Sequence, residues 1–171
     1  MRTKIITNEQ HYDEVIKRVR TAKSFIWIGT ADIKDLHVSQ EGRAVSFLHT
    51  LNQLAQKKVQ LRLIYAKTPG ENFKSSLAKY PLLQKSMETM LCPRVHFKHI
   101  IIDRTFAYTG SANLTGAGLG MKSPNRRNFE AGIITTEPVL IEQIMDQFDE
   151  VWMGKFCPSC GRKAYCETPL G

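Results

Sequence analysis

The sequence lacks any long hydrophobic run. No stretch reaches the roughly 20 consecutive apolar residues that a transmembrane helix requires. The N-terminal residues MRTKIITNEQ also lack the apolar segment and the small-residue cleavage site of a secretory signal. We therefore expect a cytoplasmic protein rather than a membrane-spanning or secreted one.

Acidic residues are scarce relative to basic ones. There are 16 Asp and Glu residues against 24 Lys and Arg residues, which gives a formal net charge of +8. This excess favours polyanionic partners, because nucleic acids and anionic lipid surfaces attract basic proteins. A basic surface that only keeps the protein soluble explains the same charge, so composition suggests a partner class and no chemistry.

Cysteine is also rare, and three of the four cysteines form the pattern C-x2-C-x5-C near the C-terminus. A C-P-x-C-G turn suits tetrahedral thiolate coordination, because it points two sulfurs inward. Since clustered cysteines of cytosolic proteins favour metal over disulfide, we predict a structural zinc site that ties the tail to the domain. Its predicted ligands are Cys92, Cys157, Cys160 and Cys166. A disulfide or redox pair, free thiols and an iron–sulfur cluster are the alternatives.

No internal repeat and no long linker divides the chain. Its 171 residues therefore fit one domain, which we place at residues 1–153, followed by a cysteine-rich tail at 154–171. Period-2 and period-3.6 hydrophobic patterns alternate along the domain, which predicts an α/β sandwich with a mixed central sheet flanked by helices. The expected strands are 4–7, 24–31, 59–66, 95–103, 106–110 and 128–135. The expected helices are 8–22, 41–58, most of 68–93 with a break at Pro81, and 138–152.

Polar residues interrupt the apolar segment RVHFKHIIIDRTFAYTGSANLTG, residues 94–116. If residues 95–103 form a strand, His96 and Lys98 share one face, and burying both without a purpose would be costly. His99 falls on the opposite, apolar face, and we interpret it as structural. The following GSAN turn suits an anion: Gly110 permits a tight turn, Ser111 and Asn113 carry side-chain donors, and a helical turn from Ala112 would present free backbone N–H groups.

These residues fit one pattern, H-x-K-x(4)-D-x(6)-G-S-x-N, without a gap. It resembles the HKD signature of the phospholipase D superfamily, and the resemblance covers roughly residues 8–152. In the segment NRRNFEAGI, Glu130 resembles the acidic residue that hydrogen-bonds the catalytic imidazole in family members. The catalytic residues that the resemblance implies are His96, Lys98, Asp103, Ser111, Asn113 and Glu130.

The resemblance implies cleavage of phosphodiesters without a catalytic cofactor. In the family, one histidine attacks phosphorus to form a phosphohistidine, and a second histidine protonates the leaving oxygen. This chain has one motif, since His11, His37 and His49 lie in no second one. We therefore expect a homodimer about a two-fold axis, in which His96 of both chains meets one phosphorus.

The surroundings of the motif predict the substrate. Basic residues between the GSAN turn and the Glu130 strand are expected at the rim of a trough for a nucleic-acid backbone, with DNA preferred over RNA. The predicted substrate-binding residues are Gly110, Lys122, Arg126 and Arg127, with Arg94 and Arg104 nearby. The alternatives are a phospholipid phosphodiesterase or phosphatidyl transferase, and a nucleic-acid-binding module of a restriction or repair system.

A second polar segment, GTADIKDLH, follows the strand expected at 24–31. Side chains at strand ends often face a ligand cleft. Asp32, Lys34 and Asp35 are therefore further candidates to line it.

Overall fold

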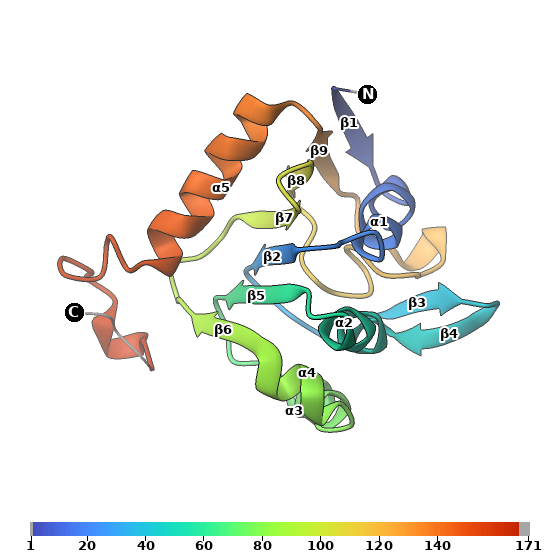
Figure 1. Cartoon of the computed structure of the whole chain (residues 1–171), viewed down its shortest axis with the longest axis horizontal. Coiled ribbons are helices and arrows are strands. Elements are labelled where there is room, and N and C mark those ends of the chain that lie inside the picture. Colours follow the sequence, from blue (N-terminus) through green and yellow to red (C-terminus); the bar gives the residue numbers. More distant parts are fainter. Residues whose placement is uncertain (1, 168–171) are drawn as a thin grey trace.

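The computed structural model describes residues 2–167. Within them lies a seven-stranded mixed sheet in the order β1-β9-β8-β7-β2-β5-β6, which confirms the predicted α/β class (Figure 1). β2, β5 and β6 run parallel, whereas β7, β8, β9 and β1 join by antiparallel pairing. The strands are β1 (Thr3–Thr7), β2 (Phe25–Thr30), β5 (Gln60–Tyr65), β6 (Met87–Leu91), β7 (Lys98–Ile102), β8 (Phe106–Gly110) and β9 (Ala131–Thr135).

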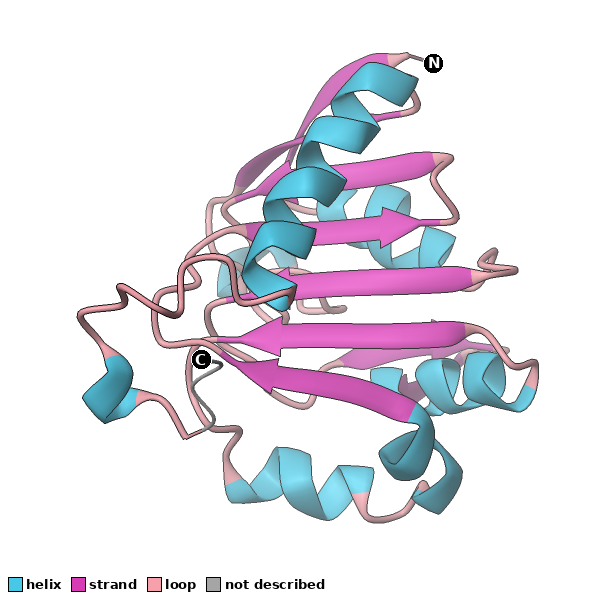
Figure 2. Cartoon of the chain, turned by 60° about the vertical axis from the view of Figure 1, so that its left-hand side comes forward, coloured by secondary structure: helices cyan, strands magenta, loops and turns pink. Residues whose placement is uncertain are grey.

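Helices cover both faces of the sheet (Figure 2). One face packs against α5 (Pro138–Trp152), whose Phe148 meets Ile101 and Ile64 of the sheet. The other face packs against the remaining helices, so that neighbouring strand residues such as Ile100 and Ile101 belong to opposite layers. These helices are η1 (Tyr12–Ile16), α1 (Lys17–Val19), α2 (Phe47–Gln56), α3 (Glu71–Leu77) and α4 (Pro81–Ser86).

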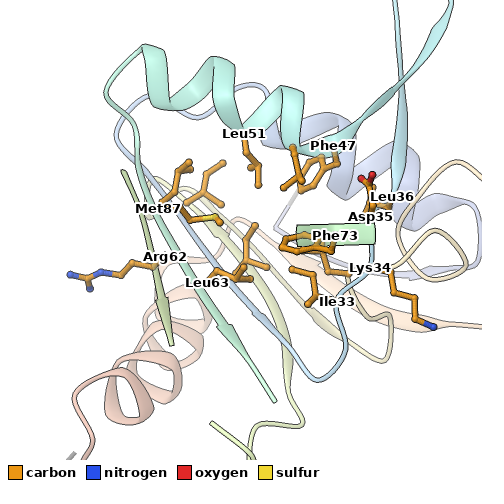
Figure 3. A pocket seen from close by; sticks show the side chains of 15 residues that line it. Ile33, Lys34, Asp35, Leu36, Phe47, Leu51, Arg62, Leu63, Phe73 and Met87 are labelled. Carbon is orange, nitrogen blue, oxygen red and sulfur yellow. The ribbon is translucent and has the colours of Figure 1, made fainter. Parts of the chain in front are cut away.

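The layer under α2 is closely packed. Figure 3 shows Phe47, Leu51, Leu63, Phe73 and Met87 around a cavity of only about 10 Å³. That volume is at most the space of one water molecule. The space between α2 and the sheet is therefore filled by core side chains.

The helix predicted at 41–58 begins later than expected. The first residues of the predicted segment instead form β4 (Arg43–Ser46), which pairs with β3 (His37–Gln40) in a separate hairpin. Glu41 and Gly42 form the turn with φ angles of 50° and 76°. Ser46 then caps α2, because its hydroxyl accepts a hydrogen bond from the Leu48 N–H at 3.2 Å.

The segment predicted as mostly helical at 68–93 contains a strand that the prediction missed. α3 and α4 are helical, and Pro81 begins α4. The chain then extends at β6, which pairs in parallel with β5 from Leu61↔Met87 to Tyr65↔Leu91. Pairing with an ordered neighbour explains a strand in residues that lack a strong β pattern of their own.

Asp103 holds two strands together at the turn between β7 and β8. Its carboxylate accepts hydrogen bonds from the backbone N–H groups of Lys23, Ser24 and Phe25 at 2.7 to 2.8 Å. Asp103 and Arg104 both have positive φ angles, of 52° and 54°, which close the tight hairpin. The motif aspartate therefore fixes the start of β2 against the end of β7.

We predict that Asp103→Ala lowers the free energy of unfolding by about 2 kcal/mol, because three amides lose a charged acceptor and water replaces it only in part. Urea unfolding measures this loss. Asp146→Ala, on the exposed side of α5, is the matched control and should stay near the wild-type value. An Asp103 variant as stable as this control would contradict the bracing role.

Candidate active site

The motif residues other than Asp103 gather at one end of the central strands of the sheet. In the strand register, Lys98 at the start of β7 pairs with Gly110 at the end of β8, and Gly110 pairs with Gly132 near the start of β9. β2 also ends there, since Gly29 pairs with His99. Residues far apart in sequence are thereby brought to one place by strand pairing.

His96 and Lys98 are in direct contact. The buried Lys98 ammonium donates to the His96 carbonyl oxygen at 2.6 Å and lies 3.2 Å from Nδ1 of the His96 ring. Burial lowers the pKa of Lys98, and the nearby Glu130 carboxylate acts in the opposite direction. The exposed His96 ring keeps its second nitrogen, Nε2, available to a substrate.

The strand predicted at 95–103 is shorter than expected. β7 begins at Lys98, so His96 lies in the preceding loop and not in the strand, although the two side chains lie on the same side and contact each other. His99 is buried, stacks on Phe97 with ring centroids 4.4 Å apart, and contacts Gln147 Oε1 through Nε2 at 2.8 Å. These contacts match the structural role expected for His99.

Glu130 lies beside the motif but contacts Ser111 rather than the imidazole. The Ser111 hydroxyl donates to one carboxylate oxygen of Glu130, and Asn128 Nδ2 donates to the other at 3.0 Å. Ser111 also accepts from the Ala131 N–H at 3.1 Å. Within residues 2–167, the predicted Glu130–His96 hydrogen bond is not formed, and Ser111 orients Glu130 rather than standing free for a phosphate.

Asn113 is held in one orientation. Its Oδ1 accepts from the N–H groups of Ala31 and Asp32, at 3.2 and 3.1 Å, and from the Thr30 hydroxyl at 3.3 Å. The side-chain NH₂ group is left as a donor for an anion. No helix begins near Ala112, so the predicted anion site at a helix N-terminus is wrong. Thr30, which the sequence did not mark as functional, thus helps to orient a motif residue.

Gly110 has a role different from the tight turn that we predicted. It lies at the end of β8, outside the residues with positive φ, and pairs with Gly132. A side chain here would overlap Tyr108 and β9. The position therefore requires glycine for close strand contact.

Asp103 lies away from these residues. It follows the carboxyl end of β7, whereas Lys98 is at the amino end. The structure therefore does not place Asp103 with the predicted catalytic residues, and its contacts are those of a structural brace.

A groove begins beside Asn113. One cavity of about 590 Å³ is lined by Asn113, Asp32, Lys34, Asp35 and Lys122, among others. A second cavity, of about 780 Å³, is also lined by Asp32, Lys34 and Asp35, and it continues to α3. The expectation that the segment after β2 lines a cleft is thereby confirmed for the hollow next to Asn113.

The two arginines of the basic loop differ. Arg126 is exposed in the short helix η2 (Pro124–Arg126). The guanidinium of Arg127 instead donates to the carbonyl oxygens of Gly118, Asn8 and Gly120, the first two at 2.8 and 3.2 Å. Most donors of Arg127 therefore hold the loop, and its substrate-binding role stays a prediction.

Asn8 is a residue that the sequence did not mark as part of the site. Its N–H donates to the Glu130 carbonyl oxygen at 3.0 Å, and its Oδ1 accepts from the Glu130 N–H at 3.1 Å. We call these two bonds the Asn8 clamp. A φ of 46°, which asparagine tolerates, makes this geometry accessible. An asparagine after a short strand was the available signal, but nothing in the sequence linked it to Glu130.

We predict that Arg127→Ala impairs activity far more than Arg126→Ala. The first change leaves carbonyl groups without a donor and loosens the loop that carries Glu130, whereas the second removes only an exposed charge. We expect Arg127→Ala to lower activity about tenfold or more. This corresponds to a loss of about 1.4 kcal/mol or more of transition-state stabilisation, because the loop no longer holds Glu130 in place. Steady-state cleavage kinetics and urea unfolding of both variants test this. Equal effects would contradict the distinction.

The four cysteines are free thiols. Cys92, Cys157 and Cys160 line one cavity of about 260 Å³, and the Cys166 thiol lies 3.9 Å from the Leu91 carbonyl oxygen. Across residues 2–167, no three Cys, His, Asp or Glu side chains are arranged to hold a metal ion as the chain stands. The Arg162 N–H donates to the Cys160 sulfur and lowers the pKa of that thiol.

Comparison with known families gives one match over most of the chain. Residues 15–152 match the family described as "Cardiolipin synthase, PLD-like domain". No curated protein sequence matches the chain. Within residues 2–167, no helix is both long and apolar enough to cross a bilayer.

Solved structures share the fold at low sequence identity. Nuc from Salmonella typhimurium, a phospholipase D family member, superposes with a TM-score of 0.62 at 18% identity over 88% of this chain and 93% of its own. NucT from Helicobacter pylori gives 0.63 at 14% identity over 86% and 93%. TrmBL2, an archaeal chromatin protein described as having a novel mode of DNA binding, gives 0.61 at 12% identity over 90% of this chain. The chain spans about half, 52%, of TrmBL2.

Proposed function

The chain belongs to the phospholipase D superfamily through a PLD-like domain at residues 15–152, and from this we propose that it is a metal-independent phosphodiesterase that cleaves DNA through a phosphohistidine on His96. The observation that carries the proposal is the contact between the exposed His96 ring and the buried Lys98 ammonium. A cation beside an accessible imidazole suits attack on an anionic phosphodiester, because it stabilises charge on the phosphoryl oxygens.

The first chemical step uses the free ring nitrogen. For the attack, the neutral His96 ring carries its proton on Nδ1 and leaves Nε2 unprotonated. Nε2 attacks phosphorus, an N–P bond forms, and the bond to the leaving oxygen breaks. That oxygen takes a proton from a second imidazole. Water then attacks the phosphohistidine, the second imidazole accepts the water proton, and the N–P bond breaks to restore His96.

The proposal requires two chains at one site. Each chain carries a single HKD motif, so the imidazole that serves as acid comes from the partner subunit's His96. The two imidazoles must start in opposite protonation states, one neutral to attack phosphorus and one charged to donate a proton. A monomer is expected to be inactive.

A groove with lysines at its sides supports a nucleic-acid substrate. Lys34 and Lys122 line the hollow beside Asn113, and Lys79 lies along its continuation. The groove also contains carboxylates: Asp35 accepts from the hydroxyls of Ser46 and Ser76, and Asp32 pairs with Lys34 at 3.7 Å. The net charge of +8 and the fold shared with a DNA-binding chromatin protein favour DNA.

The test is a cleavage assay in EDTA. Purified full-length protein is incubated with plasmid DNA, single-stranded DNA, RNA and cardiolipin-containing vesicles, and its fold is checked by circular dichroism in the same buffer. Cleavage of DNA that survives chelation supports the proposal. Lipid turnover with inert nucleic acid would indicate a phosphatidyl transferase or lipid phosphodiesterase instead, and salt-dependent DNA binding without cleavage would indicate a binding module.

A further inference from the structure

Residues 155–167 of the C-terminal tail form turns and the short helix η3 (Lys163–Tyr165), but they contain no fully buried side chain. From residue 155 to residue 167, every side chain is exposed except three, and these three are Cys157, Cys160 and Cys166. The large apolar side chains of the segment do not cover them, since Phe156 is 45% exposed and Tyr165 is 72% exposed. A short segment that only partly covers its cysteines and buries no other side chain needs another source of stability than hydrophobic burial.

The fourth cysteine lies where the tail meets the domain. Cys92 follows β6 and lines the same cavity of about 260 Å³ as Cys157 and Cys160. Cys166 reaches this region from the far end of the tail, because its sulfur lies 3.9 Å from the carbonyl oxygen of Leu91, the residue before Cys92. Cys92, Cys157 and Cys160 thus share one cavity, and the Cys166 sulfur lies beside the residue that precedes Cys92.

The local backbone has the turns that a thiolate knuckle uses. The Cys160 N–H donates to the Cys157 carbonyl oxygen at 3.2 Å, which closes the C-x2-C turn. Two residues beyond Cys160, the Arg162 N–H donates to the Cys160 sulfur at 3.4 Å. The Cys166 N–H donates to the Lys163 carbonyl oxygen at 3.1 Å and closes the second turn. Both turns hold cysteines that are neither fully buried nor fully exposed.

We propose that Cys92, Cys157, Cys160 and Cys166 together bind one structural Zn²⁺ ion. A tetrahedral all-thiolate site suits this donor set, and binding releases thiol protons as the four sulfurs become ligands. As the chain stands, the sulfurs do not surround a single point among the described residues. Binding therefore has to draw the tail turns toward Cys92 and into the cavity that the thiols share.

The site would also restrain the catalytic loop. Cys92 and His96 belong to the same short connection between β6 and β7, and the Val95 N–H donates to the Cys92 carbonyl oxygen at 3.0 Å. A metal ion bound at Cys92 thus fixes the start of the loop that presents the His96 ring. The tail becomes a support for the active site, although none of its residues up to Glu167 lies there.

Metal binding to the reduced full-length protein tests the proposal without an activity assay. We expect one equivalent of Zn²⁺ by elemental analysis, and Co²⁺ substitution should give the thiolate charge-transfer and visible d–d absorption of a tetrahedral site. Cys160→Ser and Cys92→Ser should each lose this spectrum, while Ser159→Ala, an exposed change in the same turn, should keep it. Circular dichroism and urea unfolding of the variants show that the catalytic domain remains folded.

Three results would overturn the proposal. The first is a reduced protein that binds neither ion. The second is a Cys92→Ser protein with unchanged Co²⁺ absorption, since it would remove Cys92 from the ligand set. The third is a protein that is isolated with iron and sulfide or with a disulfide among these cysteines, because its thiols would then serve another chemistry.

Discussion

His96→Ala is expected to reduce DNA cleavage by at least about four orders of magnitude, comparable to the loss of a nucleophile in other covalent enzymes. The substitution removes both the attacking nitrogen and, in the symmetric dimer, the imidazole that protonates the leaving group. Lys98 and Asn113 remain and bind the phosphodiester without a nucleophile. Substrate affinity should therefore change little, and a filter-binding or anisotropy assay can measure it beside the cleavage rate.

His49→Ala is the control for this substitution. His49 lies on α2 and contacts the Tyr80 ring, with ring centroids 6.0 Å apart, away from the motif. Its cleavage rate should stay within about threefold of wild type, an effect of less than about 1 kcal/mol. Comparable losses in both variants would show that His96 has no special role.

Subunit mixing extends this prediction to the shared site. Wild-type and His96→Ala chains are unfolded together, refolded and assayed at several ratios. If each site needs the imidazoles of both chains, activity follows the square of the wild-type fraction. A linear dependence would mean that one chain suffices, and the dimer part of the mechanism would be abandoned.

Gly110→Ala is expected to cost about 3 kcal/mol or more of folding free energy, at the upper end for an overpacked site. A Cβ atom at this position would lie 2.5 Å from the Tyr108 hydroxyl, 2.7 Å from the Ala131 carbonyl oxygen and 2.7 Å from the Gly132 Cα. Two of these three atoms are backbone of β9 and have no side-chain freedom with which to move aside. Tyr108 is fully buried, and its hydroxyl accepts from the Ala112 N–H at 3.2 Å.

The substitution should affect activity as well as stability. Separating β8 from β9 displaces Glu130, which directly precedes β9, from Ser111, which directly follows β8. Urea unfolding and cleavage kinetics should therefore both decline. Gly70→Ala is the control, because a Cβ there meets nothing within 4 Å. A Gly110 variant within about 0.5 kcal/mol of this control would show that the strands tolerate a side chain.

Elements with a strong hydrophobic period could be predicted from the sequence, and those that depend on a neighbour could not. α5 was predicted at its observed bounds, because its apolar face is regular and Pro138 marks its start. Val45 fits a helical face as well as a strand, so the hairpin before α2 was interpreted as helix. The β6 segment METML has little β pattern of its own, and its extended form follows from pairing with β5.

The candidate site shows the same division. The spacing of the motif identified His96, Lys98 and Asn113, because the order of residue types is itself the signal. It did not reveal that Asp103 braces the opposite end of β7. Nor could the sequence separate Arg126 from Arg127, since adjacent arginines look alike until the carbonyl groups that surround one of them are in place.

The Asn8 clamp makes the family boundary a poor place to truncate this protein. The matched domain begins at residue 15, so a fragment cut there keeps every residue of the HKD pattern. It would nevertheless lose β1 and also Asn8, whose N–H and side-chain Oδ1 both bond to the backbone of Glu130. An N-terminal deletion is thus expected to abolish activity although it removes no residue of the HKD pattern. An affinity tag is better attached through a spacer that leaves β1 free to pair with β9.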